Sequence, residues 1–394
     1  MINETSYAFG AQPSAIRELF AYGLERKAQI GDDNVFDYSL GNPSVPAPAA
    51  IADTLRELAD MPAQKLHGYT AAQGLASTRT AIADNLNKRF GTAYTADNLY
   101  LTMGAAASLD ASIGAITNKG DEVIVIAPYF PEYATWIAHA EAKCVEVLAR
   151  ESDFQIDVPA VEAAINERTS AVIINSPNNP VGVVYTRENL EEFAQMLERK
   201  SAELGHPIFL ISDEPYREIF FDAECMPSWV PSIYDNTLVC YSWSKSFSMP
   251  GERIGYVLVP DSVTDARRVY TAVCGSGRAL GYVCAPALMQ LLIERCVDEQ
   301  TDVEAYRENR RLLTTMLDEF GFEYIAPQGA FYLWMKAPEP DAQAFSDKAK
   351  EHELLIVPSD SFGCKGWVRL GYCVSKEVIE GSRAAFKALR ADYE

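Results

Sequence analysis

The chain has 394 residues, of which 48% are hydrophobic and 23% charged, and 34 Lys and Arg against 55 Asp and Glu give a formal net charge of −21. This composition is typical of a large globular protein of two or three domains with ample material for a buried core. So negative a chain repels phosphate backbones and anionic headgroups, which excludes nucleic acid and membrane surfaces as expected partners. An anionic ligand would need a local cationic site.

The chain begins Met-Ile-Asn-Glu-Thr, with no charged region followed by an apolar stretch, and no window approaches the ~18 apolar residues of a membrane span. We therefore expect a cytoplasmic protein. Its eight cysteines include no C-x-x-C pair and its four histidines lie far apart. A disulfide framework and a metal site are therefore not expected, and the cysteines are expected to be ordinary buried thiols.

The middle of the chain alternates apolar runs with helical patterns. Continuous apolar runs predict buried strands at 122–127, 170–175, 207–212 and 237–241. Between the second and third of these, apolar residues recur at i, i+3, i+4 and i+7 over 187–204, and Gly205 is expected to end that helix. The pattern predicts an α/β fold with a mostly parallel sheet covered by helices on both faces.

The last quarter of the chain has a different pattern. It predicts a long amphipathic helix over 302–320 that ends at Gly321, a strand within the alternating segment 330–335, and a short strand at 367–370. We interpret this part as a second, smaller α+β domain. The proline-rich stretch 42–48 is the best candidate for a linker that crosses between the domains.

Polar and small residues follow several of the predicted strands. Ligands of open α/β sheets bind outside the carboxyl ends of the strands, so these residues are the first candidates for a site. They are Gly104-Ala105-Ala106, Phe130, Asn179, Asp213, and Ser242 with Lys245.

Lys245 follows the apolar strand 237–241, in a place where burial would lower the pKa of its amine and suit it to Schiff-base chemistry. A lone lysine after a strand is more often a solvated loop charge, but Lys245 has informative neighbours. Ser242 precedes it and Arg253 follows it, so a hydroxyl and a guanidinium flank one potential phosphate position. The small residues at 104–106 open a helix whose backbone NH groups suit the same phosphate.

Three other candidates each have a purely structural alternative. Asp213 would be partly buried and needs a cationic or hydrogen-bonding partner to stay ionised, which a protonated ring nitrogen would supply; an N-cap is the alternative. Asn179 in Asn-Asn-Pro is more often a turn residue. Phe130 would normally lie in the core, although at a strand end it can stack on a flat ligand.

Four segments together carry a family resemblance. NNPVG at 178–182, SDEPY at 212–216, SWSKSFSMPGERIG at 242–255 and VRLGY at 368–372 resemble the class I/II pyridoxal 5′-phosphate aminotransferases of fold type I, in the aspartate aminotransferase superfamily. The resemblance extends from residue 40 to residue 372. It implies a large cofactor-binding domain at 46–288 with a mostly parallel sheet, and a small α+β domain formed by 1–45 and 289–394.

The resemblance also implies a role for each candidate. Lys245 would hold pyridoxal 5′-phosphate as a Schiff base and later move a proton, and Asp213 would keep the pyridine nitrogen protonated. Asn179 and Tyr216 would bond the ring oxygen, and Phe130 would stack on the ring. The phosphate would be bound by the turn at Gly104, the backbone of Ala105 and Ala106, Ser242 and Arg253.

Four further residues are assigned by the same resemblance. Arg369 would clamp the substrate α-carboxylate, where the backbone of Gly41 also lies, and Asn179 would border that site. Tyr69 matches a tyrosine that reaches the phosphate of the neighbouring subunit, which implies a homodimer with shared active sites. Arg278 lies near the position where some members place a second arginine, contributed across the dimer, for a dicarboxylic substrate; a solvated loop charge is the alternative.

Two features depart from the family pattern. Val181 stands where threonine is commoner, and the helix-start loop has Ala105, Ala106 and Ala107 where a side-chain phosphate donor is often found. Phosphate affinity is therefore expected to depend more on Ser242, Arg253 and the backbone.

The sequence thus predicts an enzyme that moves an amino group from an L-amino acid to a 2-oxo acid, with aspartate or glutamate as one substrate. A carbon–sulfur β-lyase is the first alternative, because the same Schiff base can eliminate a β-substituent and the catalytic residues do not separate the two. A non-catalytic cofactor-binding regulatory module is the second alternative, although the chain has no basic DNA-binding arm before the domain.

Overall fold

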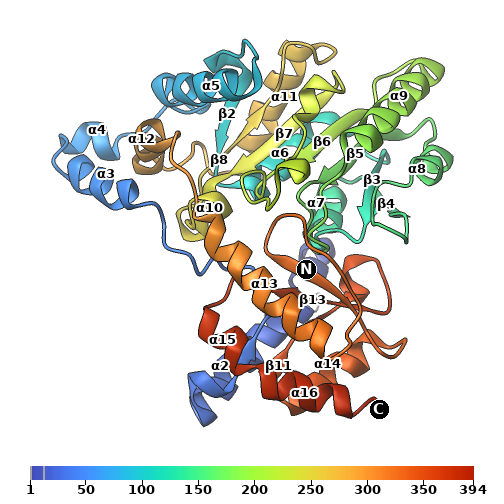
Figure 1. Ribbon diagram of the computed structural model, residues 1–394. Coiled ribbons are helices and arrows are strands. Elements are labelled where there is room, and N and C mark those ends of the chain that lie inside the picture. The colour runs from blue at the N-terminus through green and yellow to red at the C-terminus, as the bar shows by residue number, and fades with distance from the viewer. Residues whose placement is uncertain (1, 12–13) are drawn as a thin grey trace.

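A seven-stranded mixed sheet forms the centre of the upper body of the molecule (Figure 1). The computed structural model describes residues 2–11 and 14–394. The strands lie in the order β2-β8-β7-β6-β5-β3-β4, and only the contacts of β8 with its two neighbours are antiparallel. They are β2 (Leu99–Thr102), β3 (Glu122–Ala127), β4 (Lys143–Leu148), β5 (Thr169–Asn175), β6 (Phe209–Asp213), β7 (Thr237–Ser242) and β8 (Gly255–Leu258).

The central strands are mostly apolar and buried because helices cover both faces of the sheet. Along β3, Val123 and Val125 pack into one core cluster, and Ile124 and Ile126 pack into another on the opposite face. The prediction of a mostly parallel sheet buried on both sides is therefore confirmed. The upper helices are α3 (Ala49–Ala59), α4 (Ala63–His67), α5 (Ala76–Phe90), α6 (Ala105–Ile116), α7 (Glu132–His139), α8 (Val158–Ala164), α9 (Arg187–Leu204), α10 (Trp243–Ser246), α11 (Ala266–Ala279) and α12 (Ala287–Cys296).

Helix α9 has the bounds that the apolar repeat predicts. Thr186 caps its first turn through its side chain, and Gly205 ends it in the left-handed conformation with a φ of 75°. Its buried residues Leu190, Phe193 and Leu197 face the sheet.

The lower body is built from both ends of the chain (Figure 1). A four-stranded antiparallel sheet in the order β12-β13-β10-β9 and a two-stranded parallel pair, β1 with β11, lie against its helices. The helices are α1 (Glu4–Ala11), α2 (Ala15–Ile30), α13 (Val303–Glu319), α14 (Ala342–Glu351), α15 (Lys376–Gly381) and α16 (Arg383–Ala391); the strands are β1 (Phe36–Asp37), β9 (Tyr324–Ile325), β10 (Tyr332–Lys336), β11 (Leu354–Leu355), β12 (Val357–Pro358) and β13 (Trp367–Gly371).

The two bodies are joined by the proline-rich stretch and by the segment before α13. Val45 packs in the core of the lower body and Ile51 in a core cluster of the upper body, so the chain crosses between them over 42–48. Helix α12 packs against α3 and α5 and shares the core of the upper body. The predicted domain boundary at residue 288 therefore falls inside α12. Leu292 and Ile293, which follow it in the same helix, still pack in the core of the upper body.

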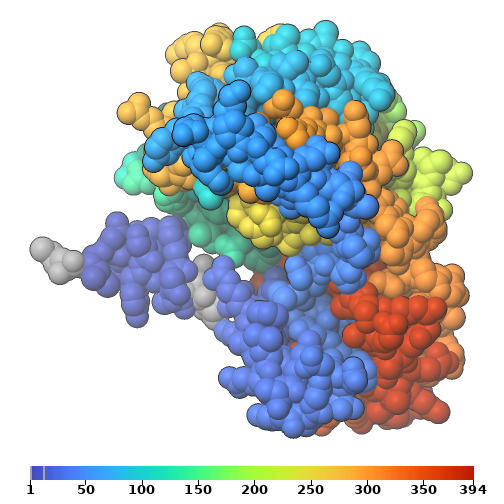
Figure 2. All heavy atoms as spheres, turned by 90° about the vertical axis from the view of Figure 1, so that its left-hand side faces the viewer, coloured from blue at the N-terminus to red at the C-terminus, as the bar shows by residue number. Residues whose placement is uncertain are grey.

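Helix α1 projects from the side of the molecule (Figure 2). None of its residues is buried, and Tyr7 is 62% exposed. Among the residues described, no helix is long and apolar enough to cross a bilayer.

Candidate active site

The carboxyl ends of the parallel strands open into a cavity of about 250 Å³ between the two bodies. Because β5, β6 and β7 run parallel, Asn175, Asp213 and Ser242 end at the same edge of the sheet. Eleven residues predicted from the sequence line this cavity: Gly41, Ala105, Ala106, Phe130, Asn179, Asp213, Tyr216, Ser242, Lys245, Arg253 and Arg369.

Lys245 lies in the short helix α10, directly after β7. Its amine donates a hydrogen bond to the carbonyl oxygen of Gly41 and lies 5.6 Å from the centre of the Phe331 ring. Burial lowers the pKa of Lys245 to about 8, and the charges of Arg369 and Arg253 act in the same direction. Roughly a tenth of this amine is therefore neutral and nucleophilic near pH 7.

Asp213 is the last residue of β6 and is 5% exposed. Its Oδ2 accepts a hydrogen bond of 2.5 Å from the hydroxyl of Tyr133, whereas its buried Oδ1 has no partner within the protein. Burial raises the pKa of this carboxyl to about 7. A turn, not a helix, follows Asp213, so the N-cap alternative is wrong. The free oxygen suits a cationic hydrogen-bond donor in the cavity.

Arg369 crosses into the cavity from β13 and is 2% exposed. Its guanidinium donates hydrogen bonds to Oδ1 of Asn179 at 3.1 Å and to the carbonyl oxygen of Ser39 at 2.6 Å. The centre of the Tyr332 ring lies 4.6 Å from the guanidinium carbon of Arg369. The Nε of Arg369 has no hydrogen-bond partner. Arg369 is therefore not part of a surface ion pair, which is the more common role of an arginine in a short strand. Its guanidinium lies in the cavity, where it suits a carboxylate.

The turn before α6 approaches Arg253 closely. A Cβ atom at Gly104, which has a φ of 86°, would lie 2.8 Å from the guanidinium of Arg253. Arg253 itself has a φ of 52° and donates a hydrogen bond to the carbonyl oxygen of Pro250. The first turn of α6, with Ala105 and Ala106, and the guanidinium therefore meet at one end of the cavity, as an anion site requires.

Gly41 and two tyrosines, Tyr216 and Tyr332, form another part of the cavity wall. The hydroxyls of Tyr216 and Tyr332 lie 3.0 Å apart, and burial raises the pKa of Tyr332 to about 12. A Cβ atom at Gly41 would lie 1.9 Å from the hydroxyl of Tyr332, so only glycine fits there.

Two predicted residues lie away from this chain's cavity. Tyr69, between α4 and α5, is 94% exposed. Arg278 is exposed in the last turn of α11, so it lies in a helix and not in the loop considered from the sequence.

The structure also adds residues that the sequence did not identify. Asn175 carried the same signal as Asp213, a polar side chain at the end of an apolar strand, and Ser244 lies next to Lys245 in the chain. Tyr332 and Tyr133 carried no such signal, because they reach the site only through the packing of β10 and α7. The additional residues at the cavity are Ile16, Leu109, Trp136, Asn175, Pro215, Ser244, Pro250 and Tyr332, with Tyr133 behind Asp213.

The described residues show neither a disulfide nor a metal-binding cluster at this site. All eight cysteines are free; three are buried and five are intermediate, so the prediction of buried thiols is only partly correct. Over residues 2–11 and 14–394, no cluster of His, Cys, Asp and Glu is suited to holding a metal ion.

Comparisons with known proteins agree with this geometry. The family model for aminotransferase class I and II matches residues 33–385. The aspartate/prephenate aminotransferase of Thermus thermophilus is 32% identical over 95% of both chains. The solved amino transferase of Eubacterium rectale is 54% identical with a TM-score of 0.97, and covers 100% of this chain and 99% of its own. A structure of Thermus thermophilus aspartate aminotransferase with maleate has 28% identity and a TM-score of 0.87, over 99% of both chains.

Proposed function

Because the chain belongs to the class I and II aminotransferases, we propose that it moves an amino group from an L-amino acid to a 2-oxo acid with pyridoxal 5′-phosphate attached to Lys245. The observation that carries this proposal is one cavity that holds the Lys245 amine, the free Oδ1 of Asp213 and the guanidinium of Arg253. These groups match the aldehyde, the ring nitrogen and the phosphate of that cofactor. When bound, pyridoxal 5′-phosphate supplies an electron sink for negative charge at the substrate Cα.

The ring would be held by groups on several sides. Asp213 would accept a hydrogen bond from the protonated ring nitrogen through Oδ1, while Tyr133 orients the carboxylate through Oδ2. Phe130 would cover a ring face, and Asn179 and Tyr216 would donate to the ring oxygen. This arrangement would favour a positive charge on the ring nitrogen beside the buried carboxyl of Asp213.

The phosphate would lie where Arg253 meets the start of α6. The first backbone NH groups of this helix, at Ala105 and Ala106, are free to donate because a helix leaves its first turn unpaired. Ser242, at the end of β7, adds a hydroxyl. No hydroxyl or ammonium side chain is present at positions 105–107, so Arg253 provides the main charge.

Lys245 would act as the proton carrier once the substrate occupies the cavity. Its pKa of about 8 lies close to neutral pH, which suits a group that both takes a proton from the substrate Cα and returns it. Arg369 holds the α-carboxylate in a planar fork and thereby orients the Cα–H bond toward the amine.

We propose an acidic amino acid, aspartate or glutamate, as one substrate. The side chains that line the cavity from this chain include three cations, and all three already have roles, so the second carboxylate needs another cation. By the resemblance, Arg278 of a second subunit lies near the position where some members have that cation, and Arg278 is exposed in the single chain. The names of the relatives add support, since two concern aspartate and one structure contains maleate, a dicarboxylate.

A homodimer with shared active sites is part of the same proposal. Tyr69 is 94% exposed in the single chain, which is unusual for a tyrosine, and contact with a second copy would cover it. Its hydroxyl would then reach the phosphate in the neighbouring cavity.

The test is reconstitution of purified protein with pyridoxal 5′-phosphate, followed by a panel of amino acids read by the visible absorbance of the cofactor. We expect borohydride to fix the cofactor to the wild type and to the surface variant Lys348→Ala, but not to Lys245→Ala. Normal turnover by Lys245→Ala would contradict the proposal. Release of pyruvate from cystathionine without a 2-oxo acid would instead indicate the β-lyase reaction.

A further inference from the structure

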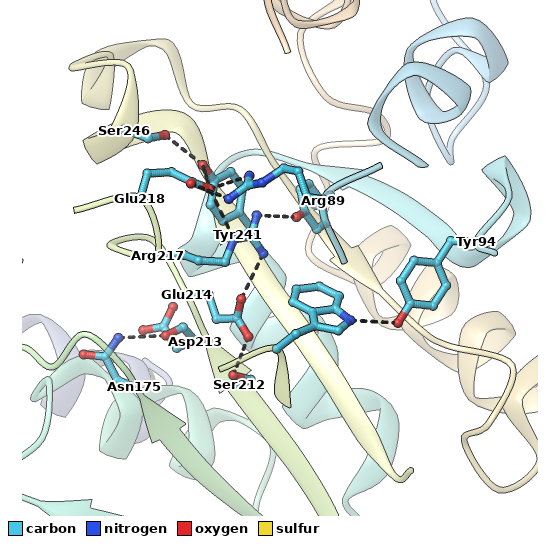
Figure 3. A network of polar contacts seen from close by, with 12 residues as sticks. Arg89, Tyr94, Asn175, Ser212, Asp213, Glu214, Arg217, Glu218, Tyr241 and Ser246 are labelled. Atoms are coloured by element: carbon cyan, nitrogen blue, oxygen red, sulfur yellow. Dashed lines mark hydrogen bonds and ion pairs between the residues drawn. The ribbon is translucent and has the colours of Figure 1, made fainter. Parts of the chain in front are cut away.

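A network of charged residues connects Glu214, Arg217, Glu218 and Arg89 (Figure 3), and none of these four residues lines the cavity of the active site. Glu214 and Arg217 are 3% and 5% exposed, and Oε2 of Glu214 lies 2.9 Å from a guanidinium nitrogen of Arg217. Neither residue lines the cavity of the active site. The reaction described above gives them no role, although burying two charges is costly.

The chain places this pair directly behind the cofactor site. Asp213 and Tyr216 line the cavity. Glu214 and Arg217, each of which directly follows one of them in the chain, do not line it and pair with each other instead. The backbone NH of Glu214 donates to the carbonyl oxygen of Cys240 at 2.8 Å and continues the sheet contact. The carboxylate of Glu214 is therefore fixed one residue away from that of Asp213.

Arg217 has polar and aromatic partners on several sides. Its Nε lies 3.2 Å from Oε1 of Glu218, another nitrogen donates to the hydroxyl of Tyr256 at 3.1 Å, and the guanidinium lies 4.3 Å from the ring centre of Tyr241. The hydroxyl of Tyr241 lies 2.8 Å from that of Ser246, the residue after Lys245 (Figure 3). The network thus touches both segments that carry the main cofactor ligands.

The charges of the network balance one another. Two carboxylates, Glu214 and Glu218, face two guanidinium groups, Arg217 and Arg89, with Arg89 bonded to both oxygens of Glu218. Removal of Arg217 would leave Glu214 with only the hydroxyl of Ser212 as a partner. The carboxyl of Glu214, whose pKa burial raises and Arg217 lowers, would then lie beside Asp213 without a cationic partner.

We propose that Arg217 is a positioning residue for the cofactor, which acts on Asp213 from behind the sheet by balancing the carboxylate that Glu214 places next to it. The inference rests on the proposed function, because it concerns the charge that the protonated ring nitrogen meets. Extra negative charge at Glu214 would favour protonation of every acid–base group near the cofactor.

The hydrogen bond from Tyr133 lowers the pKa of Asp213 and so opposes Glu214, but it brings no positive charge. Tyr133 from α7 donates this hydrogen bond to Asp213, Asn175 from β5 donates to its backbone carbonyl, and the thiol of Cys240 lies near it on β7. None of these is a cation, and Glu214 acts to raise the pKa of Asp213. Arg217 is therefore the cation that limits the effect of Glu214.

The experiment measures the pH midpoint of the visible absorbance change of the cofactor bound to Lys245. In Arg217→Met we expect the midpoint to move to higher pH by roughly half a unit or more, because Glu214 is no longer balanced. In Glu214→Gln it should move to lower pH. In Glu214→Gln/Arg217→Met, which removes both charges, it should return close to the wild-type value.

The opposite signs separate a charge effect from general damage to the fold. A structural role alone would lower cofactor affinity in every variant without a signed change of the midpoint. The same midpoint in all variants, or an equal displacement in Arg217→Met and the double variant, would overturn the proposal. If Arg217→Met does not fold, Glu214→Gln and the double variant still test the direction in which the pH midpoint moves. Arg199→Met, which removes a surface pair with Glu162, is the control. Failure of the wild type to bind the cofactor would count against the proposed function instead.

Discussion

The hydroxyl of Tyr133 donates a hydrogen bond of 2.5 Å to Oδ2 of Asp213, and Oδ1 of the same carboxyl is buried without a partner. One oxygen is thus fixed by the protein and the other is left for the cofactor. Because the hydrogen bond favours the ionised carboxylate, it opposes the effect of burial, which raises the pKa of Asp213 to about 7.

We expect Tyr133→Phe to raise the pKa of Asp213 further, since the hydrogen bond that lowers it is lost. The acid side of the kcat profile should move to higher pH, and kcat near neutral pH should fall by roughly tenfold, as for a hydrogen bond to a charged group. Tyr129→Phe is the matched control, because its hydroxyl donates to Glu146 outside the cavity. An unchanged pH profile in Tyr133→Phe would count against this role.

The reactivity of Lys245 should follow its lowered pKa. At a pKa of about 8, roughly a tenth of the amine is neutral near pH 7, whereas about one in three thousand would be neutral at the ordinary 10.5. The rate of cofactor attachment to the cofactor-free protein should therefore rise with pH and level off above about pH 8. Stopped-flow absorbance measures it, and a rise that continues to about pH 10 would show an ordinary lysine.

Replacement of Arg369 by lysine should weaken substrate binding selectively. Lysine keeps the charge but loses the planar fork that bonds Asn179 and faces the carboxylate. We expect kcat/KM to fall roughly 10- to 100-fold for amino acids and 2-oxo acids alike, while the absorbance of the bound cofactor stays unchanged. Arg383→Lys, on an exposed ion pair with Glu319, is the control. Equal losses in both variants would refute the assignment.

Gly41→Ala should disrupt the part of the cavity wall that Gly41 forms with Tyr332. The new Cβ would lie 1.9 Å from the hydroxyl of Tyr332, and this side chain cannot retreat because it is buried against Tyr216. We expect the free energy of unfolding to fall by about 1–3 kcal/mol, which thermal or denaturant unfolding measures, and amino-acid turnover to decrease. Gly275→Ala, where nothing lies within 4 Å, is the matched control and should stabilise by about 0.4–1 kcal/mol. A neutral Gly41→Ala would mean that the backbone moves easily.

Arg278→Ala tests the acidic substrate. Turnover of aspartate and glutamate should fall, while turnover of leucine or alanine should stay the same, because only a dicarboxylate needs the additional cation. Arg268→Ala, on the same helix and also exposed, controls for the loss of surface charge. Equal effects on both classes of amino acid would remove Arg278 from the site.

The sequence by itself determined the elements and the residues at their ends. Helix α9 and strand β3 have the predicted bounds, because apolar periodicity and a glycine stop are local signals. Lys245, Asp213 and Arg253 were identified because polar residues at the ends of apolar strands meet at one edge of a parallel sheet.

Only the tertiary structure decided which partners surround these residues. Tyr332 and Arg369 come from antiparallel strands of the lower body and reach the cavity only when that body packs beneath the sheet. Tyr133 and Arg217 read as ordinary helix and turn residues, and their contacts with Asp213 and Glu214 exist only in three dimensions. The reason is physical: burial and hydrogen bonding set the charge state of a site, and both depend on residues far apart in the chain.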